Sequence, residues 1–370
     1  MSAQTTIQKL LQTADVELGG TRPWDLRVSN PSFYRRVLAG GSVGLGESYM
    51  DGWWEVEQLD EFFQRVLAAR LDLKIGSEWS FLREALLARI FNWQSLMRAG
   101  ANASFHYNLG NDLYRAMLDK RLVYTCGYWS EATDLDSAQE AKLDLVCRKL
   151  NLQSGQRILD IGCGWGSFAK FAAERYGVTV VGVTVSQEQV SLGQQLCQGL
   201  PVEIKLQDYR QIEGTFDHIV SLGMFEHVGF KNYQTYMQVA RDHLADEGLF
   251  LLHTIGGNHT GYNAEPWLAK YIFPHSHVPS PRQIVEAAEG RLILEDWHNF
   301  GPDYDKTLMA WWHNFDSHWS ELQPTYGDRF YRMWKYYLLS CAGGFRARYN
   351  QLWQIVWSKN GVSGGYRSIR

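Results

Sequence analysis

Three glycines, each separated from the next by one residue, follow an apolar run in the stretch LDIGCGWG at residues 159–166. Glycine lets a backbone turn sharply and come close to a bound molecule, because it has no Cβ. The apolar run at 156–162 predicts a buried strand, and residues 165–177 predict a helix that ends at Gly177. Gly162, Gly164 and Gly166 are therefore expected to form a ligand-binding loop at the carboxyl end of a strand.

The residues around these glycines narrow the class of ligand. A nicotinamide-binding loop requires GxGxxG, and a phosphate-binding P-loop ends in Lys followed by Ser or Thr; both patterns are missing from this stretch. Asp160 stands two residues before the first glycine. This arrangement is typical of enzymes that bind S-adenosylmethionine, which we predict as the ligand.

Polar residues also follow two later apolar runs. Glu226 comes shortly after 217–223, and His253 ends the run that begins at Gly248. The carboxyl ends of parallel strands share one edge of a sheet, so both side chains are candidates for the same site. We favour a functional role for Glu226, because a carboxylate is costly to bury. His253 fits a core or a site position equally well, and Cys126 on its own resembles a small buried hydrophobic residue.

The order of apolar runs predicts the architecture that would position these residues. Strand and helix patterns alternate from residue 156 onward, and Ser186 is a suitable N-cap for the helix at 187–198. We expect a mostly parallel, doubly wound sheet. Its strands are predicted at 156–162, 178–185, 202–207, 217–223, 248–256, 291–300 and 352–359, and a further helix is predicted at 233–248.

The chain divides into three predicted regions. Residues 1–75 form a small N-terminal domain with helical patterning at 49–69 and a turn-rich stretch at 40–48. Residues 76–100 contain an amphipathic linker helix at 81–98, for which packing on its own domains is favoured over a membrane-surface role. Residues 101–370 form the domain with the glycine loop.

Composition excludes several classes of protein. The formal net charge of -4 argues against a nucleic-acid partner. The five cysteines are scattered without the spacing of a zinc site or a disulfide framework, so we expect no metal. The first residues lack a signal-peptide pattern, and no apolar run is long enough to span a bilayer. We therefore expect a cytoplasmic protein.

Nine motifs in order resemble the bacterial cyclopropane-fatty-acyl-phospholipid synthase family, whose catalytic part is related to the mycolic acid cyclopropane synthases. The resemblance extends over nearly the whole chain. The motifs are GSVGLGESYMDGWW, HYNLGNDLY, YTCGYW, ILDIGCGWGSFAKF, VVGVTVSQEQ, GMFEHVG, FLLHTIG, DYDKTLMAW and CAGGFRAR.

This resemblance implies a fold and a set of site residues. The fold would be a class I S-adenosylmethionine-dependent methyltransferase, α/β and Rossmann-like with a mostly parallel seven-stranded sheet, joined to a smaller, mainly helical N-terminal domain. The implied bicarbonate ligands are Cys126, Glu226, His253, Ile255 and Tyr304, with Cys341 as a further catalytic candidate of lower rank. The implied cofactor contacts are Tyr124, Thr125, Gly162, Cys163, Gly164, Gly166, Thr184, Val185, Ser186, Gln189, Gln207, Asp208 and Tyr209.

Thr184 follows the second strand where a general methyltransferase has an acid for the ribose hydroxyls, which matches the resembling family but not the wider class. His106 lies in the stretch that lines the site entrance in the resembling enzymes, and a structural role for it is equally plausible.

The resemblance also implies the reaction. The enzyme would transfer a methylene group from S-adenosylmethionine to the cis double bond of unsaturated acyl chains in membrane phospholipids, with bicarbonate as the proton acceptor. It would act as a homodimer at the inner face of the membrane. An enzyme that stops earlier would leave a methyl or methylene branch. A catalytically silent binding module would be expected to have lost the glycine loop or Glu226.

Overall fold

The computed structural model describes residues 2–71, 110–261 and 264–370. The predicted linker helix at 81–98 and His106 lie outside these residues. Contacts divide the chain into two compact units. Unit 1 consists of the described residues within Met1–Phe91, Asn263–Pro274 and Tyr304–Asn350, and unit 2 of those within Asn92–Tyr262, His275–Asp303 and Gln351–Arg370. The predicted domain limits at residues 75 and 100 stay a prediction.

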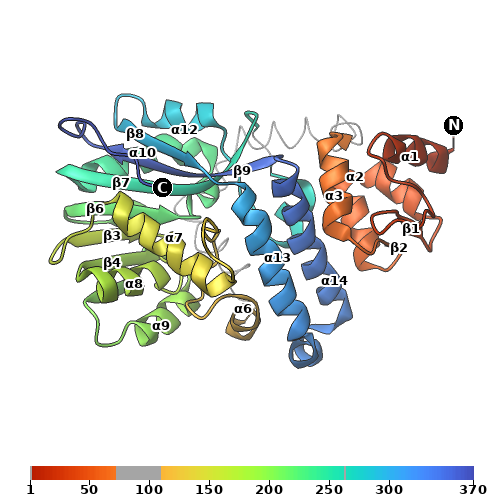
Figure 1. Ribbon diagram of the computed structural model, residues 1–370, viewed down its shortest axis with the longest axis horizontal. Helices are drawn as coiled ribbons and strands as arrows, with labels where there is room; N and C mark the ends of the chain where they lie inside the picture. The colour runs from red at the N-terminus through yellow and green to blue at the C-terminus, as the bar shows by residue number, and fades with distance from the viewer. Residues whose placement is uncertain (1, 72–109, 262–263) are drawn as a thin grey trace. The chain divides into compact units, whose positions relative to one another are not determined.

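Unit 2 is built on a seven-stranded sheet in the order β5-β4-β3-β6-β7-β9-β8, drawn in green and blue in Figure 1. All seven predicted strands are confirmed. They are β3 (Arg157–Ile161), β4 (Thr179–Thr184), β5 (Val202–Leu206), β6 (Phe216–Leu222), β7 (Leu244–Gly257), β8 (Ile293–Asn299) and β9 (Asn350–Ser358). Five neighbouring strands of the sheet run parallel to one another, namely β5, β4, β3, β6 and β7. Strand β8 pairs with β9 in the antiparallel direction.

Alternate residues of the central strand β3 enter different hydrophobic clusters. Leu159 packs in a cluster with residues of α10 (Tyr233–His243) and α12 (Pro281–Ala288). Its neighbour Ile158 packs in a second cluster with residues of α7 (Leu135–Lys149) and α8 (Ser167–Tyr176). Successive side chains of a strand point to opposite faces, so helices cover both faces of the sheet.

Caps confirm two predicted helix ends. Gly177 ends α8 in the left-handed conformation, and the Ser186 side chain accepts a hydrogen bond from the Gln189 backbone N–H at the start of α9 (Gln187–Leu196). The helix predicted at 233–248 was too long, because α10 ends at His243. The buried Leu244 begins β7 instead and pairs with Phe216 of β6.

The strand order places the glycine loop at a switch point. The chain passes from β3 to β4 on one side and later returns to β6 on the other side of β3. Connections that leave in opposite directions open a crevice at the carboxyl end of such a strand. The loop that follows Ile161 lies at this end.

Unit 1 is mainly helical, as predicted for the N-terminal region. Its helices α2 and α3 both pack against α14, the longest helix of the described chain. No helix in the described ranges is long and apolar enough to cross a membrane. The elements are α1 (Ala3–Gln12), β1 (Arg27–Val28), α2 (Phe33–Met50), β2 (Trp54–Glu55), α3 (Leu59–Ala68), α11 (Pro266–Tyr271), α13 (Pro302–Ser317, from Tyr304 onward) and α14 (Trp319–Arg346). The remaining short helix, α6 (Asn111–Met117), belongs to unit 2.

The turn predicted at residues 40–48 is wrong, because this stretch lies inside α2. Gly41 kinks the helix with φ 53° and ψ -132°. Gly46 serves packing, since a Cβ there would lie 2.3 Å from the ring of Trp267. The helix predicted at 49–69 is also interrupted: α2 ends at Met50, and the short strand β2 precedes α3.

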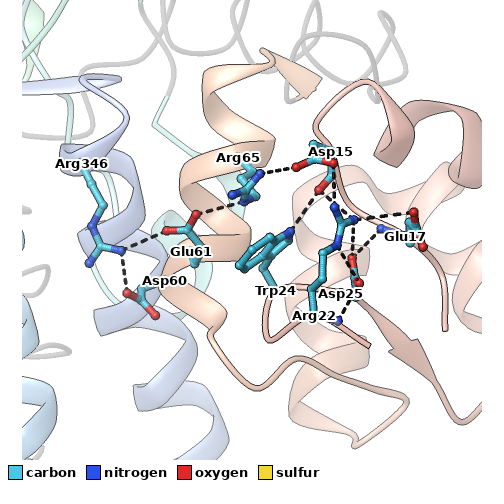
Figure 2. A network of polar contacts seen from close by, with 9 residues as sticks. All are labelled: Asp15, Glu17, Arg22, Trp24, Asp25, Asp60, Glu61, Arg65 and Arg346. Carbon is cyan, nitrogen blue, oxygen red and sulfur yellow. Dashed lines mark hydrogen bonds and ion pairs between the residues drawn. The ribbon is translucent and has the colours of Figure 1, made fainter. Parts of the chain in front are cut away.

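A chain of ion pairs connects the N-terminal segment of unit 1 to α3 and α14 (Figure 2). Arg22 pairs with Asp15 at 2.7 Å and with the buried Asp25 at 2.8 Å. Arg65 of α3 then joins Asp15 to Glu61 at 2.7 and 3.0 Å. At the far end, Arg346 of α14 binds Asp60 of α3 at 2.7 Å. Since Arg22 hydrogen-bonds its carboxylate, the pKa of Asp25 falls to about 2.

The two glycines of α2 allow a matched test of this packing. We expect Gly46→Ala to lower the free energy of unfolding by about 1–3 kcal/mol, because the added methyl group would overlap Trp267. Gly40 lies in the same helix, and a Cβ there meets no atom within 4 Å. Gly40→Ala is therefore expected to raise stability by about 0.5–1 kcal/mol. Urea denaturation measures both, and equal stabilities for the two variants would contradict the assigned contact.

Candidate active site

The glycine loop turns through three left-handed residues at the end of β3. Gly162, Gly164 and Gly166 have φ values of 80°, 56° and 80°. A Cβ at Gly162 would lie 2.6 Å from Met224, and one at Gly166 would lie 2.6 Å from Ile204. At Gly164 no atom lies within 4 Å of the Cβ position. The outer two glycines are thus needed for packing, while Gly164 leaves space beside the backbone.

Asp160 places a carboxylate beneath this loop. The side chain lies on β3 and is 2% exposed, and burial raises its pKa to about 7. Its Oδ2 atom has no hydrogen-bond partner among the described residues. A buried carboxylate oxygen without a partner is costly unless a donor binds it. The amino group of S-adenosylmethionine is a donor of suitable charge.

Helix α7 fixes the segment that contains Tyr124, Thr125 and Cys126. The buried Lys142 donates a hydrogen bond from Nζ to Thr125 Oγ1 at 2.6 Å. The buried Gln139, one turn earlier, donates from Nε2 to the Thr125 carbonyl at 2.7 Å. Although burial lowers the pKa of Lys142 to about 8, the group stays largely charged at neutral pH. Two side chains of α7 therefore hold Thr125, one by its hydroxyl group and the other by its carbonyl group.

The sequence interpretation missed Gln139 and Lys142, although a signal was present. They fall in the buried stripe of α7 formed by Leu135, Ala138, Val146 and Lys149 at spacings of three and four residues. A lysine or glutamine in such a stripe must find a partner inside the protein.

The carboxyl ends of β6 and β7 meet this segment. A Cβ at Gly223, just after β6, would lie 2.6 Å from Thr125 Cγ2. The Gly223 N–H donates to the carbonyl of His253 on β7 at 2.9 Å. The glycine loop is also near, since Gly162 faces Met224, the residue after Gly223. The ends of β3, β6 and β7 and the segment with Thr125 thus form one site.

Glu226 and Ile255 are directly bonded within this site. Glu226 lies in a short 3-10 helix (Phe225–His227), and its Oε1 accepts a hydrogen bond from the Ile255 N–H at 2.7 Å. Its Oε2 is buried and has no partner among the described residues. Burial raises the pKa of Glu226 to about 7. The carboxyl group is therefore held by one oxygen and presents the other.

His253 presents a second buried atom of this kind. The residue is 1% exposed, and burial together with the charges of Lys142 and Lys149 holds its pKa well below the usual range. Its Nδ1 lies 3.3 Å from Nε2 of Gln354 on β9, while its Nε2 has no partner within the described chain. His253 is thus a neutral imidazole with one ring nitrogen available.

The other predicted catalytic residues have different surroundings. Cys126 is fully buried, and its thiol donates to the Gly127 carbonyl at 3.1 Å. Tyr304 and Cys341 belong to unit 1. There Tyr304 packs on Phe345 with ring centroids 4.6 Å apart, and burial raises the pKa of the Cys341 thiol to about 12. Their predicted parts in the site stay predictions, and such a thiol is a poor proton acceptor at neutral pH.

The predicted cofactor residues beyond the glycine loop lie at the ends of β4 and β5. Thr184 Oγ1 donates to Gln189 Oε1 at 2.6 Å, and the Gln207 N–H donates to the Thr184 carbonyl at 2.9 Å. The Asp208 carboxylate is bound by Arg210 through two hydrogen bonds of 2.7 Å. The contact of Asp208 with the cofactor stays a prediction. Further predicted contacts at these strand ends are the half-buried Val185, the capping Ser186 and the buried Tyr209.

Two further predicted cofactor residues are Tyr124 and Cys163, and Cys163 belongs to the glycine loop itself. Tyr124 stacks edge-on against Tyr114 with ring centroids 5.3 Å apart. The Cys163 N–H donates to the Val183 carbonyl at 3.1 Å, which joins the glycine loop to the end of β4. Contacts of both residues with the cofactor stay predictions.

Comparisons with known proteins show the family and the fold of this chain. The family model described as mycolic acid cyclopropane synthetase matches residues 94–355. A cyclopropane-fatty-acyl-phospholipid synthase of Escherichia coli is 52% identical over 362 residues, which are 98% of this chain and 94% of that protein. A probable fatty acid methyltransferase of Pseudomonas putida is 37% identical over 68% of each chain.

A solved structure shows the same fold with a ligand related to S-adenosylmethionine. The mycolic acid cyclopropane synthase CmaA1, complexed with SAH and CTAB, superposes with a TM-score of 0.66 at 32% identity. The match covers 70% of this chain and 98% of that one. The fold is thus that of an S-adenosylmethionine-dependent methyltransferase, as predicted.

The open space at Gly164 gives a test of cofactor binding. We expect Gly164→Val to abolish S-adenosylmethionine binding, because a branched side chain would fill the space beside the loop. Gly199 is a matched control, since it also has a positive φ and an open Cβ position but lies in the turn before β5. Gly199→Val should carry similar backbone strain and bind normally. Calorimetry with both variants decides, and normal binding by Gly164→Val would remove the loop from the site.

Proposed function

Because the chain belongs to the mycolic acid cyclopropane synthetase family, we propose that it converts cis double bonds in the unsaturated acyl chains of membrane phospholipids into cyclopropane rings, with S-adenosylmethionine as methylene donor. The substrate class follows the relative that matches 98% of the chain. The observation that favours ring formation is a pair of buried atoms, Glu226 Oε2 and His253 Nε2, that have no hydrogen-bond partner among the described residues.

The chemistry needs both a methyl donor and a base. The alkene attacks the sulfonium methyl group, so a C–C bond forms as the C–S bond breaks, and S-adenosylhomocysteine leaves. The acyl chain then holds a positive charge, and the ring closes when the new methyl group loses a proton. Water would capture the cation, so the base has to act in a dry site. Burial of Asp160, Glu226 and His253 meets this requirement.

Bicarbonate would supply the proton acceptor when bound. The residues present fit such an anion: the free carboxylate oxygen of Glu226 can accept from its hydroxyl group, and a protonated His253 Nε2 can donate to its charged oxygens. Cys126, Ile255 and Tyr304 are proposed as further contacts. Cys341 ranks below them as a catalytic candidate, because the raised pKa of its thiol disfavours the thiolate.

The proposal extends to the setting of the reaction. We infer that the enzyme is cytoplasmic, associates transiently with the inner face of the membrane and acts as a homodimer. The substrate supports the first two points, because its double bond lies within an acyl chain of the bilayer. The homodimer rests on the family resemblance.

A lipid C-methyltransferase is the second candidate. The Pseudomonas putida relative is described as a probable fatty acid methyltransferase, so a methyl- or methylene-branched product lies within the range of similar proteins. Such an enzyme would lose the proton in a different place or quench the cation differently. The presence of Glu226, His253 and Tyr304 together favours the ring.

Product analysis distinguishes the two outcomes. We expect vesicles of unsaturated phospholipids, incubated with the protein and S-adenosylmethionine, to gain one CH2 group per modified chain and to show cyclopropane proton signals by NMR. A methylene branch has the same mass, so NMR has to locate the ring. A branched product would select the second candidate, and reaction of short, monomeric unsaturated acids at the same rate would contradict the membrane substrate.

Glu226→Gln tests the role of the carboxylate. The amide keeps the shape of the side chain but loses its charge, so we expect S-adenosylmethionine to bind normally while turnover falls roughly 10²-fold or more. Glu247→Gln, on an exposed part of β7, is the matched control and should leave turnover unchanged. Bicarbonate depletion should slow the wild type and added bicarbonate restore it, with little response from Glu226→Gln. Wild-type turnover by Glu226→Gln without any bicarbonate effect would assign the base to another group.

A further inference from the structure

A buried glutamine lies beside the proposed anion ligand His253. Gln354 is in the interior strand β9, next to β7 in the sheet, and both side chains are fully buried. The Gln354 amide nitrogen Nε2 lies 3.3 Å from His253 Nδ1. The edge of Phe300 covers the imidazole from another side, with centroids 5.9 Å apart.

We propose that Gln354 is a positioning residue that fixes the tautomer of His253, so that the ring proton resides on Nε2. In the observed orientation of the amide, Nε2 faces the ring, and the buried Oε1 has no partner among the described residues. An amide nitrogen can only donate a hydrogen bond, so in this orientation Nδ1 accepts it. A neutral imidazole has one N–H, so the proton goes to the other nitrogen. The low pKa of His253 agrees, since it keeps the ring neutral at physiological pH.

The tautomer determines what His253 can do in the site. With the proton on Nε2, this buried atom, which has no partner in the described part of the chain, is a donor, and a donor suits the oxygen of an anion. With the proton on Nδ1, the same atom would be a lone pair and would repel that oxygen. This inference rests on the proposed function for the identity of the anion, but the tautomer itself does not.

An amide differs from a carboxylate at this position in its effect on charge. A carboxylate would accept from Nδ1 and would favour the imidazolium, as in many histidine pairs. Gln354 instead adds no charge next to a ring that already faces Lys142 and Lys149. His253 can thus donate a hydrogen bond from its neutral ring, without being converted to the imidazolium. This leaves proton removal to the anion.

The experiment reads the tautomer directly in the full-length protein. Long-range 1H–15N spectra of 15N-histidine-labelled protein distinguish protonated from unprotonated ring nitrogens, and loss of one signal set in His253→Asn assigns the residue among the 11 histidines. We expect the wild type to have the proton on Nε2. Gln354→Glu should place a proton on Nδ1, and Gln354→Leu should remove the preference.

Activity measurements connect the tautomer to turnover. We expect kcat to fall roughly 10- to 100-fold in both Gln354 variants, the scale seen for outer partners that orient a histidine, with unchanged S-adenosylmethionine affinity. Gln351→Leu is the matched control, because Gln351 is also buried on β9 but bonds to Asn299. It should leave both the His253 spectrum and kcat unchanged. Gln354→Glu keeps the side-chain shape, so it serves if Gln354→Leu does not fold.

The outcomes separate this inference from the proposed function. A wild-type His253 protonated on Nδ1, or Gln354 variants that lower kcat without changing the tautomer, would overturn the role of Gln354. A confirmed tautomer in an enzyme that ignores bicarbonate would instead keep the role of Gln354 and reject the anion.

Discussion

The site depends on one constraint. Ionisable side chains at the carboxyl ends of β3, β6 and β7 are removed from water. Burial raises the pKa of Asp160 and of Glu226 to about 7 and holds that of His253 far below its usual value. The shifts of the two carboxyl groups bring their charged and neutral forms close in free energy near neutral pH, whereas the shift of His253 keeps its ring neutral. The surrounding elements keep these side chains buried, while Asp160 Oδ2, Glu226 Oε2 and His253 Nε2 have no hydrogen-bond partner among the described residues.

The partners that orient the site come from elements without a recognisable motif. Helix α7 supplies Lys142 and Gln139, and β9 supplies Gln354. The sequence predicted Glu226 and His253, because polar residues after apolar runs are visible locally. It could not predict Gln354, since β9 is the last strand of the chain but lies next to β7 in the sheet. Only the strand order brings His253 and Gln354 together across 101 residues.

Prediction of the elements succeeded where a local pattern was enough. Each strand of the seven-stranded sheet was visible as an apolar run, and Gly177 and Ser186 correctly predicted helix ends. Prediction failed at residues 40–48, where the glycines suggested turns. Those glycines instead serve α2, because Gly46 faces the ring of Trp267 more than 200 residues away. Without the distant partner, a glycine needed for close packing is indistinguishable from one needed for a turn.

The ion pair between Asp60 of α3 and Arg346 of α14 also has a consequence for biosynthesis, because its two residues are 286 positions apart. Translation at about 5–20 residues per second separates their appearance by roughly 15–60 seconds. During that interval α3 has emerged, but the helix against which it packs has not, and its buried face with Leu59, Phe62 and Phe63 is open to other molecules. The first part of the chain to be made is thus among the last to reach its native contacts, and the apolar face of α3 stays without its partner helix until α14 is released.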